Sequence, residues 1–276
     1  RANVRFNPSE SVNLRVSYAG GYRAPQAFDE DMHIAIVGGK RVRIRLADDL
    51  KEERSHSVSL SADLYHTFGK VQTNLLVEGF YTILDDVFAL RDMDDAADGG
   101  KVKERYNGSG ATVRGFNVEG RAAFTRWFEL QAGVTLQQSR YKEPEFWSED
   151  AEVPPVRRMF RTPDAYGYFT ASFKPVRNFT ADLSGTCTGS MLVQHMAGSG
   201  VAQDVAVSTP SFFDMNIRLS YDVRIYKEIT MQLYGGVQNL FNAYQKDFDK
   251  GVDRDSGYIY GPSLPRSWFV GAKFSF

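Results

Sequence analysis

The sequence lacks the features that mark several common classes of protein. A single cysteine, Cys187, among 276 residues excludes an internal disulfide framework and a cysteine-based metal finger. The 33 lysines and arginines nearly balance the 34 aspartates and glutamates, so no basic field exists to attract nucleic acid. No apolar run approaches the ~20 residues that a transmembrane helix needs. A nucleic-acid-binding protein is therefore not expected, and a helical membrane protein is excluded.

What the sequence does contain is a two-residue alternation of apolar and polar side chains, which is the period of a β-strand. The segments 57–64 and 71–81 flank a short turn and predict a hairpin. The segments 116–124 and 128–136 predict a second hairpin, and 213–223 alternates most regularly. About eleven strands are predicted: a stub before Asn7, then 12–18, 57–64, 71–81, 116–124, 128–136, 164–174, 179–192, 213–223, 229–241 and 268–276.

The predicted connections between these strands alternate in length. Short turns are expected near 7–11, 66–70, 125–127, 174–178 and 225–228. Long polar loops are expected near 23–53, 91–107, 142–163, 193–210 and 243–265. Outer-membrane barrels have this layout, with short periplasmic turns and long extracellular loops.

Alternation alone also fits a soluble barrel, whose apolar side chains fill the interior. Three features favour a membrane barrel, in which the apolar side chains face lipid. The strands are long, aromatic residues recur near strand ends, and the last strand places Trp268, Val270, Phe274 and Phe276 on one face that we expect to meet the membrane. The fold class predicted is all-β, a transmembrane antiparallel β-barrel. Because single-chain bacterial barrels have even strand numbers, eleven strands indicate about half of a barrel with roughly 22.

Two motifs resemble those of TonB-dependent outer-membrane receptors. The first is Tyr22-Arg23-Ala24-Pro25, followed after a long loop by Asp48-Asp49-Leu50-Lys51-Glu52, where many members carry NPNLKPE. The second is Val237-Gln238-Asn239-Leu240-Phe241-Asn242 before the final strand. The first motif departs from the family's pattern in its first part, and the two stand in the family's order across most of the chain.

The resemblance implies that residues 1–276 are the C-terminal part of a 22-stranded barrel, with the N-terminal strands and plug domain lying outside this sequence. It implies a receptor in the outer membrane of a Gram-negative bacterium that actively takes up a metal chelate such as a ferric siderophore, haem or cobalamin. The implied partners are the plug and barrel half of the same receptor, outer-membrane lipid, the chelate ligand, and the TonB complex, which would bind an N-terminal box.

Other functions remain open from the sequence. A passive outer-membrane porin or structural barrel would have the same strands without a plug. An enzyme is not expected, because the sequence has no nucleophile elbow and no HExxH motif.

Five residues of the external loops are the candidate ligand-binding residues: Arg23, Asp29, Glu30, His33 and His195. His33 lies where haem receptors of the family carry an iron-ligating histidine, and an imidazole is a suitable axial ligand. His195 lies beside Met191 and Met196, whose soft side chains suit an apolar chelate. The alternative is that both are ordinary loop histidines and that Arg23 belongs to a structural strand exit.

No cofactor is expected, except calcium in external loops that are rich in acidic residues. Asp92, Asp94, Asp95 and Asp98 are the calcium candidates, although they lack the spacing of an EF-hand. A second acidic group contains Asp247, Asp249, Asp253 and Asp255. Arg41, Arg43 and Arg45 suit an anionic ligand or lipopolysaccharide. For all three groups the alternative is solvated loop charge.

Overall fold

The computed structural model describes residues 1–26, 42–93, 101–148, 150–262 and 264–276, and this part of the chain is built from strands and turns. Among these residues no helix is long and apolar enough to cross a bilayer. The candidates Asp29, Glu30 and His33 lie outside the described residues, as do Asp94, Asp95 and Asp98.

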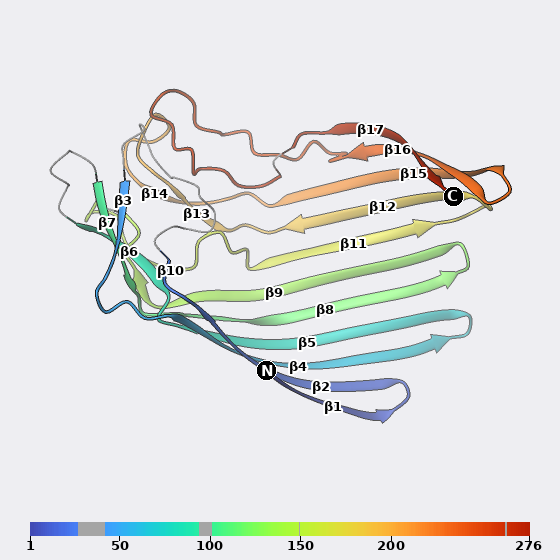
Figure 1. The fold of residues 1–276 in the computed structure, drawn as a ribbon, viewed down its shortest axis with the longest axis horizontal. Helices are drawn as coiled ribbons and strands as arrows, with labels where there is room; N and C mark the ends of the chain where they lie inside the picture. The colour runs from blue at the N-terminus through green and yellow to red at the C-terminus, as the bar shows by residue number, and fades with distance from the viewer. Residues whose placement is uncertain (27–41, 94–100, 149, 263) are drawn as a thin grey trace.

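One curved antiparallel sheet forms the body of the structure (Figure 1). Eleven strands follow one another in chain order along it, which confirms the eleven predicted from alternation. They are β1 (Ala2–Ser9), β2 (Val12–Arg23), β4 (Glu53–Phe68), β5 (Val71–Asp85), β8 (Ala111–Thr125), β9 (Phe128–Glu145), β11 (Ala165–Phe173), β12 (Phe179–Thr188), β15 (Phe212–Tyr226), β16 (Ile229–Gln238) and β17 (Ser267–Ser275).

Several strands differ in length from the prediction. β8 begins five residues before the predicted start at 116, and β9 runs to Glu145 instead of 136. The extra residues of β9 carry polar side chains on both faces, so the ladder continues where the alternation has stopped. The predicted strand 179–192 ends at Thr188, where the Gly189 amide donates to the Ala165 carbonyl (2.8 Å) and closes the ladder.

The short turns and the long connections lie at opposite ends of the sheet (Figure 1), as the sequence predicted. The long connections hold short strands that their polar composition did not reveal. β3 (Val42–Leu46), β7 (Lys101–Asn107) and β6 (Phe88–Met93) form one small sheet, in which β3 and β7 are parallel. β13 (Leu192–His195) and β14 (Val205–Ser208) form a hairpin, and β10 (Val156–Arg158) pairs with β9.

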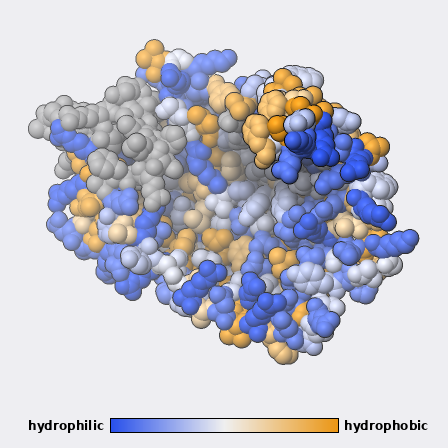
Figure 2. Space-filling view, turned by 45° about the vertical axis from the view of Figure 1, so that its right-hand side comes forward, coloured by the Kyte–Doolittle hydropathy of each residue, from blue (hydrophilic) through white to orange (hydrophobic). Residues whose placement is uncertain are grey.

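The two faces of the large sheet differ in chemistry because successive side chains of a strand point to opposite sides. Register places Val16 opposite Leu60 and Val118 opposite Val134, so the apolar set is continuous from strand to strand. These side chains are exposed, with Leu60 at 60%. Figure 2 shows hydrophobic and hydrophilic residues interleaved over the surface in that view. An exposed apolar face of this extent is what a lipid-facing surface requires.

The last strand belongs to this apolar face. Trp268 pairs with Val237, Val270 with Gly235, and Phe274 with Met231. Trp268 is 75% exposed and Val270 is 90% exposed. Phe274 and Phe276 are also exposed.

The sheet is open within the described residues, because β1 and β17 each pair on one side only. An unpaired edge leaves a row of backbone donors and acceptors without partners. Both edges of the described sheet are thus left with unpaired backbone groups.

We predict that a charge in the middle of the apolar face destabilises the barrel. In the intact protein, Val134→Arg should lower the free energy of unfolding by about 2–4 kcal/mol, the cost of placing an arginine at the centre of a bilayer. Val134→Met, which adds bulk without charge, is the control and should change it by less than about 1.5 kcal/mol. Equilibrium unfolding in lipid vesicles measures both, and equal stability of the arginine variant and the wild type would contradict a lipid-facing Val134.

Candidate functional site

The candidate residues that the structure describes, Arg23 and His195, lie in different parts of the loop end. Arg23 ends β2, whereas His195 ends β13. The backbone of Asp92 lies in β6, opposite Lys103 of β7. The predicted set is therefore not gathered into one site by the residues described.

Arg23 connects three strands where the chain leaves the barrel. Its guanidinium donates to the Glu53 carboxylate of β4 (3.0 Å) and lies over the ring of Phe88 of β6, 4.9 Å from the centroid. The same carboxylate oxygen accepts the Phe88 amide (3.2 Å). These contacts match the alternative interpretation of Arg23 as part of a structural strand exit.

A second element of the loop end is a folded unit, which we call the loop module: the β13–β14 hairpin together with residues 243–262 of the β16–β17 connection. The two parts and the first residue of β15, Phe212, share a small apolar core, whose other members are Val193, Tyr258 and Tyr260, and each of the four is less than 10% exposed. Inside it, the Gln245 side chain donates to the Tyr258 carbonyl (3.0 Å) and accepts the Tyr260 amide (2.7 Å). This connection, predicted as a polar loop, is therefore an ordered structure.

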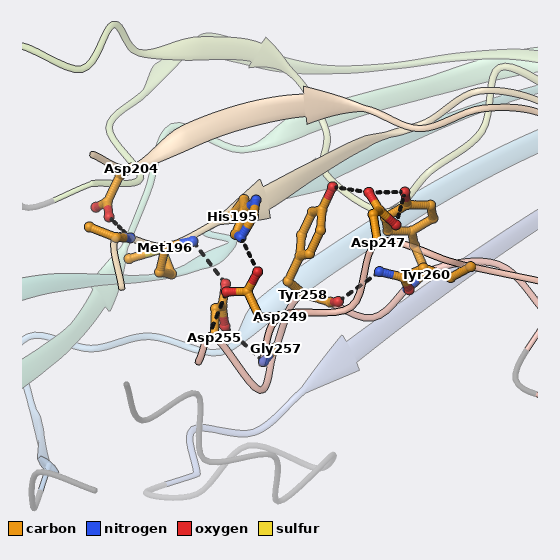
Figure 3. A network of polar contacts seen from close by, with 11 residues as sticks. His195, Met196, Asp204, Asp247, Asp249, Asp255, Gly257, Tyr258 and Tyr260 are labelled. Atoms are coloured by element: carbon orange, nitrogen blue, oxygen red, sulfur yellow. Dashed lines mark hydrogen bonds and ion pairs between the residues drawn. The ribbon is translucent and has the colours of Figure 1, made fainter. Parts of the chain in front are cut away.

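His195 lies at the contact between the two parts of the loop module (Figure 3). Its Nε2 is 3.0 Å from an Asp249 carboxylate oxygen, and the two side chains are only 8% and 4% exposed. The imidazole ring stacks on the Tyr258 ring, with centroids 3.6 Å apart and planes 7° from parallel. A chelate approaching from solvent meets little of this imidazole.

The acidic residues near His195 accept backbone amides of the two connections that meet there. Asp255 accepts the amides of Met196 (2.8 Å) and Gly257 (2.8 Å), and its own amide donates to Asp249 (3.0 Å). Asp204 accepts the Ala197 amide (2.7 Å) (Figure 3).

In the described part of the chain no three metal-ligating side chains are grouped closely enough to hold an ion. The expected role of these acidic residues as solvated charge is thus wrong for Asp249 and Asp255, because burial forces each to take hydrogen-bond partners.

Asp247 is bound by two phenols of the same loop. Tyr260 donates to both of its carboxylate oxygens (2.7 Å each), and Tyr258 donates to one (3.0 Å). Burial favours the neutral acid, but the hydrogen bonds from Tyr260 and Tyr258 outweigh it and lower the pKa of Asp247. Burial and the neighbouring carboxylate raise the pKa of Tyr260. The carboxylate and both neutral phenols therefore form one hydrogen-bonded group at neutral pH.

The sequence did not single out Tyr258, Gln245 and Tyr260 as site residues. The pattern Tyr258-Ile259-Tyr260 carries a signal, since two aromatic residues two positions apart in a polar segment suit burial on one side. Nothing in the sequence predicts that these tyrosines contact His195, because Tyr258 lies 63 positions after it in the chain.

The segment from Asn239 to Asn242 follows β16 and positions the backbone where the loop module begins, at residue 243. Asn239 and Asn242 have positive φ angles (50° and 55°), which asparagine tolerates better than most residues. The buried Asn239 side chain donates to the carbonyls of Ala243 (3.0 Å) and Leu264 (2.9 Å) and accepts the Ala243 amide (2.8 Å). The two asparagines thus form the turn that ends β16, which the Asn242 amide closes by donating to the Asn239 carbonyl (2.8 Å).

Polar side chains bridge neighbouring strands on the face of the sheet opposite the apolar one. Glu78 accepts from Asn117 (3.1 Å), whose amide oxygen accepts from Thr135 (2.8 Å) across three strands. Glu119 accepts from Gln131 (2.9 Å) one step nearer the turns. Such a face supplies hydrogen-bonding groups to a wet interior or to a domain that fills it.

We predict that Asp249 holds the loop module together. Asp249→Ala removes the partner of the buried His195 and the acceptor of the Asp255 amide. Leaving such groups unsatisfied costs about 1–3 kcal/mol, so amide exchange in β13 and β14 should speed up by about 5- to 150-fold.

Hydrogen exchange of the intact protein, followed by mass spectrometry, measures this change. Asp253→Ala, which removes an exposed carboxylate of the same loop, is the matched control and should leave exchange unchanged. Unchanged exchange in the Asp249 variant would show that the apolar core alone fixes the module.

The fold agrees with that of known transport receptors. The ferric-catecholate import receptor Fiu of E. coli K12 superposes with a TM-score of 0.64 at 17% identity, over 98% of this chain and 34% of that one. The FrpB iron transporter of Neisseria meningitidis gives 0.62 at 16% identity, over 98% and 38%. The siderophore receptor PirA of Acinetobacter baumannii gives 0.63 at 16% identity, over 99% and 40%. The chain thus spans 34–40% of the length of these receptors.

No curated protein matches the chain by sequence. The family profile described as "TonB dependent receptor-like, beta-barrel" matches residues 1–240, which is most of the chain. The profile covers β1 to β16, including the first of the two motifs that suggested the resemblance. The chain belongs to the TonB-dependent receptor-like β-barrel family.

Proposed function

We propose that this chain is the C-terminal part of the barrel of an outer-membrane receptor that imports a metal chelate with energy supplied through TonB. Members of its family are transporters rather than enzymes. The observation that carries the proposal is the family match over the barrel strands, together with a polar face on the sheet opposite its apolar face.

A ferric chelate is the first candidate cargo. Structures with this fold are described as a ferric-catecholate import receptor, a ferric enterobactin receptor, an iron transporter and a siderophore receptor. One is described as a copper transporter. Haem and cobalamin belong to the same class of large, scarce metal chelates and are the other cargoes to test.

The proposed assembly supplies what the described sheet lacks. N-terminal strands of the same receptor would close the barrel against β1 and β17, and a plug would occupy the polar interior. The ligand would enter from the end that carries the loops, because the loop module and the strand exit at Arg23 lie there.

Uptake in a living cell tests the proposed function. A strain without the full receptor should lose accumulation of its radiolabelled ferric chelate, and restoring the receptor should restore it. Deleting TonB from the restored strain should abolish uptake again, because a passive barrel needs no energy source. Accumulation that continues without TonB would favour the alternative of a porin.

His33 remains the candidate for binding haem iron, because an imidazole in an external loop suits an axial position. In the full receptor, His33→Ala should lower haem uptake at least tenfold, roughly the effect of losing one good ligand contact. His66→Ala is the matched control, since His66 lies in β4 near the turn end. Unchanged uptake of haem and of cobalamin by the His33 variant would remove His33 from the binding site.

A further inference from the structure

The apolar face of the sheet changes character at the loop end of β4 to β9. Arg114 of β8 lies two residues from Phe116, and Arg140 of β9 lies four residues from Leu136. Because side chains alternate along a strand, both arginines point to the same side as Phe116 and Leu136. Phe116 and Leu136 are 64% and 55% exposed, and both arginines are exposed as well. The arginines therefore stand where the apolar band ends.

Register brings these two arginines together. Arg114 is the direct partner of Gln138, and Arg140 is the next residue of β9 on that face. Diagonal neighbours of this kind are about 7–8 Å apart across an antiparallel pair. Two guanidinium groups at that spacing can donate to the oxygens of one phosphate.

Neither arginine is neutralised in the part of the chain that the structure describes. Arg114 donates to the uncharged amide oxygen of Gln138 (2.8 Å). The side chain of Arg140 makes no hydrogen bond and no ion pair among the described residues.

Three neighbouring cations on this side have carboxylate partners. Arg54 is paired with Glu52 (2.6 Å) and Lys142 with Asp85 (2.5 Å). Arg158, the β10 partner of Arg140, is paired with Asp164 (3.1 Å). Arg114 and Arg140 thus lack the carboxylate partners that these three neighbouring cations have.

The opposite end of the same strands has a different surface. Phe124, Phe128 and Phe173 gather there around Trp127, with ring centroids 5.0–6.3 Å apart. Aromatic rings of this kind sit at the level of lipid headgroups without requiring a charged partner. At the loop end, the apolar band stops instead at two neighbouring arginines, Arg114 and Arg140.

We propose that Arg114 and Arg140 bind the phosphate of a lipid headgroup in the leaflet nearest the loops. The occupant is a lipid and not a free anion, because the two side chains directly continue an apolar face that acyl chains would cover. Tyr81, the cross-strand partner of Arg114, is 44% exposed and adds an amphipathic ring at the same level. The proposal rests on the membrane placement given above and is independent of the cargo.

The test uses the full receptor in nonionic detergent, titrated with mixed micelles that contain dioleoyl phosphatidic acid or dioleoyl phosphatidylcholine. Native mass spectrometry counts the lipid retained. The wild type should retain phosphatidic acid preferentially, and Arg114→Gln combined with Arg140→Gln should reduce that preference by about 30-fold, as expected for two cations at a membrane surface.

The matched control is Arg126→Gln combined with Arg177→Gln, which removes two exposed arginines from the turns at the other end of the sheet. This control should keep the preference for phosphatidic acid. An equal loss in both pairs would overturn the proposal, because it would show a general effect of net charge. Displacement of the lipid by millimolar inorganic phosphate would also overturn it by assigning the site to a free anion.

Chelate binding, measured on the same proteins, separates this proposal from the proposed function. Both double variants should bind the ferric chelate as the wild type does. If the lipid preference is lost while chelate binding persists, the headgroup site stands by itself. If no form of the receptor binds a chelate, the proposed function fails and the lipid result is unaffected.

Discussion

Backbone hydrogen bonding is the constraint on which the rest of this structure depends. A chain that crosses lipid finds no water to pair with its amides and carbonyls, so strands can cross only as a continuous ladder. The ladder from β1 to β17 meets this demand with antiparallel pairs of up to 15 matched residues, as between β4 and β5. Where it stops, at β1 and β17, backbone groups need partners from elsewhere.

Alternation of the two faces follows from this ladder. Once register is fixed, every side chain belongs to one face, and a slip of one residue would exchange the faces. Apolar residues such as Val118 and Val134 therefore meet across strands, while Glu78, Asn117 and Thr135 bridge strands on the other side. One backbone arrangement thus yields a surface suited to lipid and a surface suited to water or to a packed domain.

The loop end is under a different constraint, because its backbone groups can form hydrogen bonds with water. There the chain can bury polar groups, provided that each finds a partner. The loop module does so around four apolar residues, with His195 stacked on Tyr258 and bonded to Asp249. Because the contact joins two connections far apart in the chain, the loops at this end have a defined arrangement above the barrel strands.

The strands and their two faces can be predicted from the residue pattern alone. Residues such as Phe213 and Met215 alternate with polar neighbours because the pleat repeats every two residues, and this local rule needs no knowledge of partners. The sequence also indicated the turn at Asn239, since asparagine tolerates positive φ angles. It did not predict that β9 continues to Glu145, because polar side chains on both faces erase the alternation there.

The fold of the loops and the contacts of their charged residues are seen only in the tertiary structure. Asp249 and Asp255 appear in the sequence as two more acids of a polar segment, and His195 as an exposed candidate ligand. Their roles depend on which loops meet in space, and that meeting is set by the order of the strands and the size of the connections. Arg114 and Arg140 show the same principle. They are 26 positions apart in the chain and become neighbours only through the register of β8 and β9.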